Sequence, residues 1–404
     1  MLSTEKIAII KSTVPVLAEH GEKITKCFYE MMFTDHPELL NIFNHANQKQ
    51  GKQPKALANT VYAAAMHIDN LEAIIPVVKQ IAHKHRSLNI KASHYPIVGK
   101  YLLLAIKDVL GDAATDDIMN AWAEAYGIIA DVFISVEKEM YAEAASVDGG
   151  WKEFRKFVVS KKVKESDVIT SFYFKPEDGG KITSFQPGQY ISIKVVIDGE
   201  QYTHIRQYSL SDSSGNEYYR ISPKLEVGQG DIPGGKVSHY LHNDIVEGDI
   251  VELTSPAGDF VLKTESELPV VLISGGVGQT PMISMLKTLA DNHPEKEVTY
   301  IHAAINGSTH AFKDEVLEID NENDQIKSFL CYETPAVEDK AAQSYQKEGY
   351  FDLNWLQSIL KNNQAEFYFC GPIPFMKAVN NALIEWEVPE ARINYEFFGP
   401  ATTL

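Results

Sequence analysis

The chain has 404 residues, of which 44% are apolar and 23% charged, a composition typical of a globular protein with several domains. Its 37 basic and 55 acidic residues give a formal net charge of −18 without a basic stripe, which excludes a nucleic-acid partner. No apolar run approaches the ~20 residues that cross a bilayer, so no obligatory membrane partner is expected. Cys27, Cys331 and Cys370 form no C-x-x-C pair, so we expect neither disulfides nor a zinc site. We also expect the protein to be cytoplasmic.

Residues 1–147 carry the pattern of an all-helical domain. Apolar residues recur there at spacings of three and four, between residues that favour helix ends. One predicted helix begins after Thr115, a cap residue, and continues through Trp122 and Phe133. The pattern stops at Asp148–Gly150, which places the first domain boundary after residue 147.

Two different patterns follow along the chain. Residues 148–264 contain short β-rich runs separated by turn signals such as DGG, PGQ and SSGN, which predicts an antiparallel β-barrel. In residues 265–404, short apolar strands such as VVLIS and EFYFC alternate with helical stretches, which predicts an α/β domain with a parallel sheet. The predicted order is therefore all-α, β-barrel, α/β.

A histidine lies on an apolar helix face in the first domain. Val78, Ile81 and Ala82 precede His85 by seven, four and three residues, so the four share one face. A histidine in such a place is most often a packed core residue. A second apolar stripe begins at Leu57, with Gln53 one turn before it. Buried faces that offer an imidazole and an amide could instead enclose a flat cofactor.

Further residues in this domain carry a resemblance. Tyr29 in CFYEMMF, Phe43 in NIFN, Gln53 and the pair Lys84–His85 resemble the globin domain of flavohaemoglobins, and the resemblance extends to the C-terminus. It implies that His85 is the axial ligand of a haem b iron, and that Tyr29 and Gln53 hydrogen-bond iron-bound O₂. It also implies three further haem contacts, from Phe43, Leu57 and Lys84.

The resemblance adds two residues on the proximal side of the haem. Tyr95 in SHYPIV and Glu137 in ISVEKEMY occupy the places of the family's proximal tyrosine and glutamate. A carboxylate that accepts the Nδ1–H of an axial histidine makes the imidazole more basic and favours activation of O₂ over its storage. A helical glutamate is usually a solvated position, and the sequence leaves open whether these side chains touch His85.

Three motifs in the β-rich domain point to a flavin. The run Arg206, Gln207, Tyr208, Ser209 resembles the R-x-Y-S signature of ferredoxin–NADP reductase-like flavin domains. There Arg206 would pair with the FAD pyrophosphate, Tyr208 would pack on the isoalloxazine ring and Ser209 would lie near N5. Two other segments resemble flavin contacts: PGQY with Tyr190, and GGKVS with Gly235, Val237 and Ser238. The segment 225–233 is longer than the usual turn, and with Pro223 it leaves the local strand register open.

In the α/β domain, a glycine-rich turn follows the strand VVLIS. The turn GGVGQTP can approach a dinucleotide pyrophosphate, with Thr280 capping the next helix and Pro281 in its first position. We assign to the NAD(P)H site the turn residues Gly276, Val277, Gly278, Gln279, Thr280 and Pro281.

The last two strands of the α/β domain end in further family signatures. In EFYFCGP, the residues Cys370, Gly371 and Pro372 would border the nicotinamide, although Cys370 alone could be an ordinary buried thiol. In YEFFGP, Phe398 would cover the flavin face and Glu396 would lie near the flavin. Phe397, Gly399 and Pro400 are assigned to the cofactor site by proximity.

Joined in one chain, these features resemble a nitric oxide dioxygenase. NAD(P)H would reduce FAD, FAD would reduce the haem, and haem-bound O₂ would oxidise nitric oxide to nitrate. Two alternatives stay open: an oxygen carrier or sensor, and a flavin reductase acting on quinones, ferric iron or hydroperoxides. The sequence also leaves open the choice between NADH and NADPH, the oligomeric state, and whether a lipid occupies the distal pocket.

Overall fold

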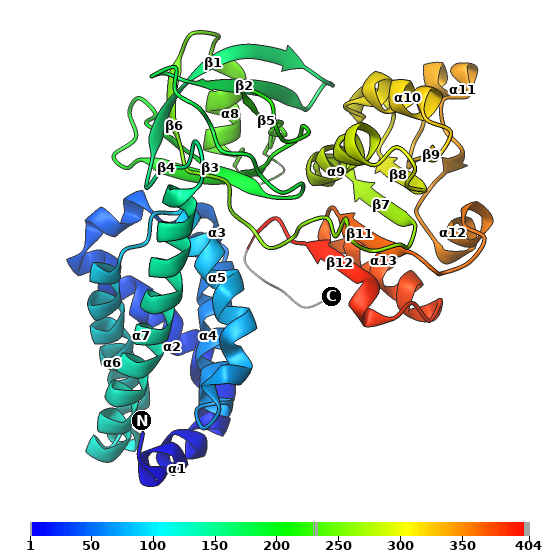
Figure 1. Ribbon diagram of the computed structural model, residues 1–404. Coiled ribbons are helices and arrows are strands. Elements are labelled where there is room, and N and C mark those ends of the chain that lie inside the picture. Colours follow the sequence, from blue (N-terminus) through cyan, green and yellow to red (C-terminus); the bar gives the residue numbers. More distant parts are fainter. Residues whose placement is uncertain (1, 229, 231–232, 400–404) are drawn as a thin grey trace. The chain divides into compact units, whose positions relative to one another are not determined.

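The computed structural model describes residues 2–228, 230 and 233–399, with the elements labelled in Figure 1. The chain divides into two compact units. The first contains residues up to 154 together with 194–206 and Gly399, and the second contains 155–193 and the described part of 207–398. No helix within the described ranges combines the length and apolar character that a membrane span requires.

Residues 4–146 are mainly helical, as predicted. The α-helices are α1 (Thr4–Ser12), α2 (Val14–Asp35), α3 (His45–Lys49), α4 (Lys52–Met66), α5 (Ile75–Ser87), α6 (Tyr95–Leu110) and α7 (Asp116–Ser146). Helix α2 packs against α4 and α6, and α5 packs against α7. Large side chains such as Phe28, Met32 and Trp122 fill the core between these helices.

The start of α7 follows from its sequence. The side chain of Thr115 accepts a hydrogen bond from the amide of Ile118, so it is the predicted cap. Asp116 and Asp117 in the first turn complement the positive end of the helix dipole. The 31-residue helix carries Phe133 and Glu137 among its buried residues.

An antiparallel sheet follows the helices. Its strands are β1 (Arg155–Lys164), β2 (Thr170–Pro176), β3 (Tyr190–Val195), β4 (His204–Ser209), β5 (Tyr219–Ile221) and β6 (Ile250–Leu253), in the order β4-β3-β6-β1-β2-β5. Strand β2 pairs with β5 in the register Phe172↔Ile221. A bridge between Leu210 and Ile221 joins the two edges of the sheet, which closes it as the predicted barrel. Helix α8 (Lys236–Asn243) lies between β5 and β6 in sequence.

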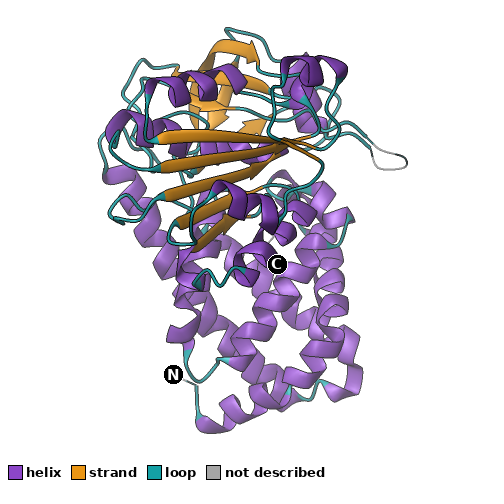
Figure 2. Cartoon of the chain, turned by 90° about the vertical axis from the view of Figure 1, so that its right-hand side faces the viewer, coloured by secondary structure: helices purple, strands orange, loops and turns teal. Residues whose placement is uncertain are grey.

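A parallel sheet forms the remainder. Its strands are β7 (Val270–Gly275), β8 (Val298–Ala304), β9 (Ile326–Tyr332), β10 (Lys347–Glu348), β11 (Glu366–Cys370) and β12 (Ile393–Glu396), in the order β10-β9-β8-β7-β11-β12. The helices of this part are α9 (Gln279–Asn292), α10 (Lys313–Glu322), α11 (Val337–Ala342), α12 (Leu353–Ile359) and α13 (Ile373–Glu385). Figure 2 shows these strands side by side with helices on both sides.

Both faces of the parallel sheet are buried. Along β7, Val270 and Leu272 pack in the core on the α9 side, whereas Val271 and Ile273 pack in the core with α13. This alternation explains why the strand reads as a continuous apolar run. The fold class predicted from sequence is therefore confirmed in all three parts.

Candidate functional site

Three side chains from three helices meet around His85. The Nδ1 atom of His85 on α5 lies 2.7 Å from Oε1 of Glu137 on α7 and 3.2 Å from the hydroxyl of Tyr95 on α6. The Tyr95 hydroxyl donates to the same Glu137 oxygen at 2.5 Å. The structure therefore brings together three residues whose contact the sequence left open.

Burial and charge in this cluster hold the His85 imidazole with its Nδ1 atom toward Glu137. Burial raises the pKa of Tyr95, and the charge of Glu137 raises it further, so the phenol keeps its proton and donates to the carboxylate. Glu137 is 3% exposed and accepts from Tyr95 and His85 together. With Nδ1 engaged, Nε2 has no hydrogen-bond partner among the described residues. An imidazole held in this way fits the axial ligand of a haem iron.

The second polar group of the helical part surrounds Tyr29 on α2. Tyr29 is 7% exposed, and its ring contacts that of Phe43 edge-on at 5.7 Å between centroids. Burial raises the pKa of Tyr29, and the amides of Gln48 and Gln53 partly offset that effect, so the phenol is neutral at pH 7. Leu57 lies one turn after Gln53 on α4 and packs on the same core. A neutral donor beside an amide in an apolar setting fits the polar side of a haem pocket.

Sequence reasoning missed Gln48. Its Nε2 atom is buried and makes no hydrogen bond within the described ranges, and its side chain lies close enough to Tyr29 to affect the pKa of that residue. The run NQKQGKQ contains glutamines at 48, 50 and 53, and this density of amide side chains is the sequence feature that could have indicated Gln48. Lys84, predicted to contact the haem, donates through Nζ to the carbonyl of Gly399 at 3.2 Å.

Two of the flavin motifs are adjacent in the barrel. The amide of Leu210, directly after Ser209, donates to the carbonyl of Gln189 in PGQY at 2.9 Å. Tyr190 exchanges two backbone hydrogen bonds with Ala257 and is 8% exposed. Gly188 has a φ of +104°, and a Cβ atom there would lie 2.2 Å from the carbonyl oxygen of Phe260. PGQY therefore requires its glycine both for backbone conformation and for close packing.

The strand β4 presents the R-x-Y-S motif on alternating faces. Arg206 and Tyr208 are half-buried on one face, whereas Gln207 between them is exposed. Ser209 is buried, and the Arg206 guanidinium donates to the carbonyl of Ile205 at 2.7 Å. A planar cation and an aromatic ring on one face of a strand fit a flavin dinucleotide.

The GGKVS segment forms the start of α8. Its cap is Gly235, and the amide of Gly235 donates to the carbonyl of Glu226. Ser238 accepts from the amide of Glu226 at 3.1 Å, while the Val237 side chain is buried in the core. Strand β5 ends at Ile221, before Pro223, so the longer segment leaves the β2–β5 register intact.

The glycine-rich turn after β7 meets the end of β11. Because β7 and β11 are parallel neighbours with Ser274 opposite Cys370, both predicted segments lie at the same edge of the sheet. A Cβ atom on Gly278 would lie 2.3 Å from the carbonyl oxygen of Cys370, so only glycine allows this approach. Burial raises the pKa of the Cys370 thiol, which therefore stays protonated.

The prediction that Thr280 caps the helix after this turn is wrong. Residues Gly276–Gly278 wind into a 3₁₀ turn that continues directly into α9, whose cap is Gly278. Thr280 already lies in the first helical turn, where its hydroxyl donates back to the carbonyl of Val277 at 3.1 Å. Pro281 is accordingly the third helical residue instead of the first. The run of glycines starts the helix early because it permits a tight turn that other residues do not.

Gln279, the first residue of α9, carries a buried side-chain amide. It is fully buried, and neither its amide nitrogen nor its amide oxygen has a hydrogen-bond partner in the described structure. A buried amide without partners is costly unless a bound molecule satisfies it. At the start of a helix beside a glycine-rich turn, this amide fits a dinucleotide.

The C-terminal signature continues from β12. Glu396 lies opposite Cys370 in the parallel pair, which places it at the same edge of the sheet. Phe397 packs in the core with α13, whereas Phe398 is 50% exposed. Gly371 and Pro372 begin the turn into α13, and Gly399 ends the described chain, so Pro400 lies outside the described residues.

Comparisons with known families match all three parts. The globin family model matches residues 26–133. The models described as oxidoreductase FAD-binding domain and oxidoreductase NAD-binding domain match residues 156–262 and 272–381. The chain therefore contains a globin domain followed by the two parts of a flavin-dependent oxidoreductase.

Solved structures include similar proteins. A flavohaemoglobin from Malassezia yamatoensis with bound FAD and haem has a TM-score of 0.83 at 29% identity, covering 98% of this chain and all of that chain. The FAD/NAD-binding domain of nitric oxide dioxygenase from Vibrio cholerae O1 biovar El Tor is 43% identical with a TM-score of 0.56, covering 62% of this chain and all of that chain.

Curated relatives match over the full length. The "Flavohemoprotein" of Bacillus thuringiensis subsp. konkukian (strain 97-27) is 62% identical over 404 residues, covering both chains completely. That of Bacillus subtilis (strain 168) is 54% identical over 404 residues, covering all of this chain and 99% of the relative. Identity at this level across all three parts shows that the chain belongs to the flavohaemoprotein family of oxidoreductases.

Proposed function

We propose that this protein is a nitric oxide dioxygenase that uses NAD(P)H and O₂ to convert nitric oxide to nitrate. The observation that carries the proposal is the buried Glu137 carboxylate on Nδ1 of His85 at 2.7 Å. A flavin oxidoreductase in the same chain supports it, as does the 43% identity to a domain of an enzyme named nitric oxide dioxygenase.

The cofactors supply the redox chemistry when bound: hydride from the nicotinamide, single electrons from the flavin, and O₂ activation at the haem iron. Within the chain, His85 would hold the haem iron through Nε2, while Glu137 accepts the Nδ1 proton. The carboxylate increases the basicity of the imidazole, and Tyr95 fixes the carboxylate by donating to it. This arrangement favours O₂ activation over reversible storage.

The opposite side of the proposed pocket contributes neutral donors. Tyr29 keeps its proton because burial raises its pKa, and it offers that proton to a diatomic substrate together with the amide of Gln53. Phe43 and Leu57 exclude water from the same region. These residues bind and orient the substrate, while none of them acts as a proton donor of low pKa.

The remaining assignments extend this proposal. We assign residues 1–147, 148–264 and 265–404 to the haem, FAD and NAD(P)H domains, within which the three family matches fall. Arg206, Tyr208 and Ser209 are assigned to FAD, and Gln279 to the dinucleotide. A cytoplasmic location agrees with three free cysteines in the structure.

Replacement of His85 tests the proposal against its competitors. In H85A, NADH-driven reduction of an artificial dye through the flavin should persist, whereas consumption of nitric oxide should disappear. An oxygen carrier would show no nitric oxide-dependent NADH oxidation in the wild type. Retained nitric oxide consumption in H85A would instead assign the activity to the flavin part alone.

A further inference from the structure

A cluster of four charges lies in the second unit, with two of its members buried and two half-buried. Arg220 on β5 and Asp212, which follows β4, come from the barrel, while Lys287 on α9 and Glu315 on α10 come from the parallel-sheet part. The Nζ atom of Lys287 lies 2.5 Å from Asp212 and 2.5 Å from Glu315. Arg220 lies 3.3 Å from Glu315 and 3.6 Å from Asp212.

Asp212 pairs with both cations of this cluster. Its carboxylate also accepts from the hydroxyl of Tyr218 at 3.0 Å, and its backbone carbonyl accepts from the hydroxyl of Ser284 at 2.7 Å. Burial raises the pKa of Asp212, but the charges of Arg220 and Lys287 outweigh that effect and hold the pKa below its usual value. The carboxylate is therefore ionised whenever the protein is folded near neutral pH.

The position of Asp212 in the sequence connects it to the flavin motif. Asp212 lies three residues after Ser209, the last residue of R-x-Y-S, in the same continuous segment. Its partners Ser284 and Lys287 lie on one face of α9, five and eight residues after Gln279. One residue thus joins the segment that leaves the flavin motif to the helix that begins at the dinucleotide turn.

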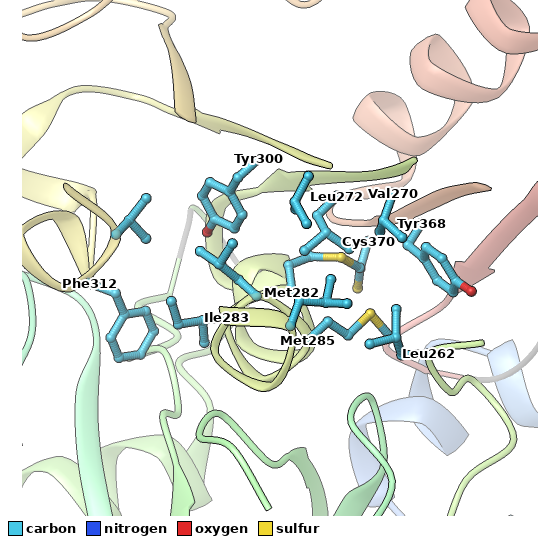
Figure 3. Packing of buried hydrophobic residues seen from close by; sticks show 14 of the residues in the cluster. Leu262, Val270, Leu272, Met282, Ile283, Met285, Tyr300, Phe312, Tyr368 and Cys370 are labelled. Atoms are coloured by element: carbon cyan, nitrogen blue, oxygen red, sulfur yellow. The ribbon is translucent and has the colours of Figure 1, made fainter. Parts of the chain in front are cut away.

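The apolar packing beneath the cluster is continuous. Leu262 from the barrel end and Met285 from α9 lie beside Tyr368 of β11, and all three belong to one core (Figure 3). On the other side, Phe312 lies beside Ile283, and the Arg220 guanidinium lies 4.9 Å from the Phe312 ring. A close-packed core transmits small displacements instead of absorbing them.

We propose that Asp212 is a positioning residue, which holds the R-x-Y-S segment against α9 through Ser284 and Lys287 and so aligns the two sites for hydride transfer. The inference rests on the proposed function, because it requires FAD and NAD(P)H in those sites. In that step a hydride leaves C4 of the nicotinamide with both electrons of its bond and is taken up at flavin N5, and solvent supplies one proton to the flavin. A misplacement of about 1 Å between such reactants lowers the rate roughly 100-fold.

Two variants test the alignment by different interactions. K287Q removes the charge that pairs with Asp212. S284A removes only the neutral hydrogen bond to the carbonyl of Asp212, so it can still test the inference if K287Q folds poorly. K287R, which restores the cation, serves as the rescue. K327Q is the matched control, because Lys327 on β9 pairs with Asp320 at 3.0 Å within the parallel-sheet part alone.

The rate constant for anaerobic flavin reduction at saturating NADH should fall about 10- to 100-fold in K287Q and less in S284A. The dissociation constant for the nucleotide should change little. The kinetic isotope effect on flavin reduction, measured with NADH deuterated at C4, should become more temperature-dependent. In the absence of nucleotide, hydrogen–deuterium exchange at the backbone amides of α9 and residues 209–213 should become faster. K287R should recover most of the rate, and K327Q should match the wild type.

The outcomes separate the inference from the proposed function. Should NADH and NADPH both fail to reduce the wild-type flavin, the proposed function fails. Should the wild type be reduced while S284A and K287Q keep its rate and isotope effect, the positioning role is overturned. Loss of bound FAD from both variants would also overturn it, because the cluster would then retain the cofactor instead of aligning it.

Discussion

Glu137, which is 3% exposed, accepts hydrogen bonds from two donors. Its partners His85 and Tyr95 lie 52 and 42 residues away in sequence, so the contact depends on how α5, α6 and α7 pack. Sequence patterns report local periodicity, which predicted the helices and the apolar face of His85. They could not predict that these three atoms lie within hydrogen-bond distance, because that contact depends on tertiary packing.

The E137Q variant tests the role of this carboxylate. A neutral amide is a weaker acceptor, so the imidazole should be less basic and nitric oxide dioxygenase activity should fall about 10- to 100-fold. The iron–histidine stretching frequency in resonance Raman spectra should also decrease. E139Q, at an exposed position two residues along α7, should leave both quantities unchanged. An E137Q protein with wild-type frequency and activity would contradict the assignment.

The Tyr29 hydroxyl is tested by Y29F, which keeps the ring and its contact with Phe43. A hydrogen bond to a charged or polarised group contributes about 1.5–3 kcal/mol, so O₂ should dissociate roughly 10- to 100-fold faster. Flash photolysis measures that rate. Y62F, at a partly exposed position on α4, provides the control. Equal dissociation rates in wild type and Y29F would remove Tyr29 from the pocket.

A buried histidine pair makes the stability of the parallel sheet depend on pH. His302 and His310 lie 4.5 Å apart between ring centroids, and each Nδ1 is bonded, to Ser274 and Tyr332 respectively. Burial lowers the pKa of both, assisted for His310 by the charge of Lys313, and that of His310 falls to about 3. Both imidazoles are therefore neutral in the folded protein near pH 7.

The sign of the effect follows from proton uptake. Between pH 6.5 and about 3 the unfolded chain binds a proton at His310 that the folded chain does not, so stability decreases as the pH falls. The slope approaches about 1.4 kcal/mol per pH unit for each histidine. Urea midpoints between pH 7.5 and 5.5 should therefore fall more steeply in the wild type than in H310Q. Parallel pH profiles would show that other groups dominate the acid response.

Among the secondary-structure elements, the glycine-rich turn after β7 depends on the close approach of its backbone to the end of β11. The sequence pattern placed the turn between β7 and a helix, but with Thr280 taken as the cap the predicted helix began at Pro281. Three glycines instead continue the chain directly into α9, with Gly278 against the carbonyl of Cys370. The close approach involves β11, almost 100 residues later, which no local pattern contains.

The G278A variant measures how much this approach matters. Its Cβ would overlap the Cys370–Gly371 peptide, so the turn should shift, with a loss of roughly 1–3 kcal/mol in stability and a higher KM for NAD(P)H. Gly127 on α7 has no neighbouring atom within 4 Å of the same position, so G127A should be neutral or stabilising by about 1 kcal/mol. A G278A protein with unchanged melting temperature and KM would contradict the steric argument.

Over the full chain, the resemblance carried by short motifs predicted the order of the three parts and the family. The barrel and the parallel sheet were predictable because their strands differ in pattern: β1 and β2 alternate with turn signals, whereas β7 and β11 are continuous apolar runs. The cluster around Asp212 was not predictable, because its four charged residues form no recognisable pattern in the sequence. They come together only in the folded chain, where β5, α9 and α10 meet.

In the proposed function, reducing equivalents pass from NAD(P)H through the flavin to an iron held by His85. Anaerobic mixing of the purified holoprotein with NADH or NADPH, followed by rapid-scan absorption, measures this transfer. We expect bleaching of the flavin band, followed by a shift of the Soret band from its ferric to its ferrous position. A haem that stays ferric while the flavin is reduced, or the absence of any Soret band, would contradict it.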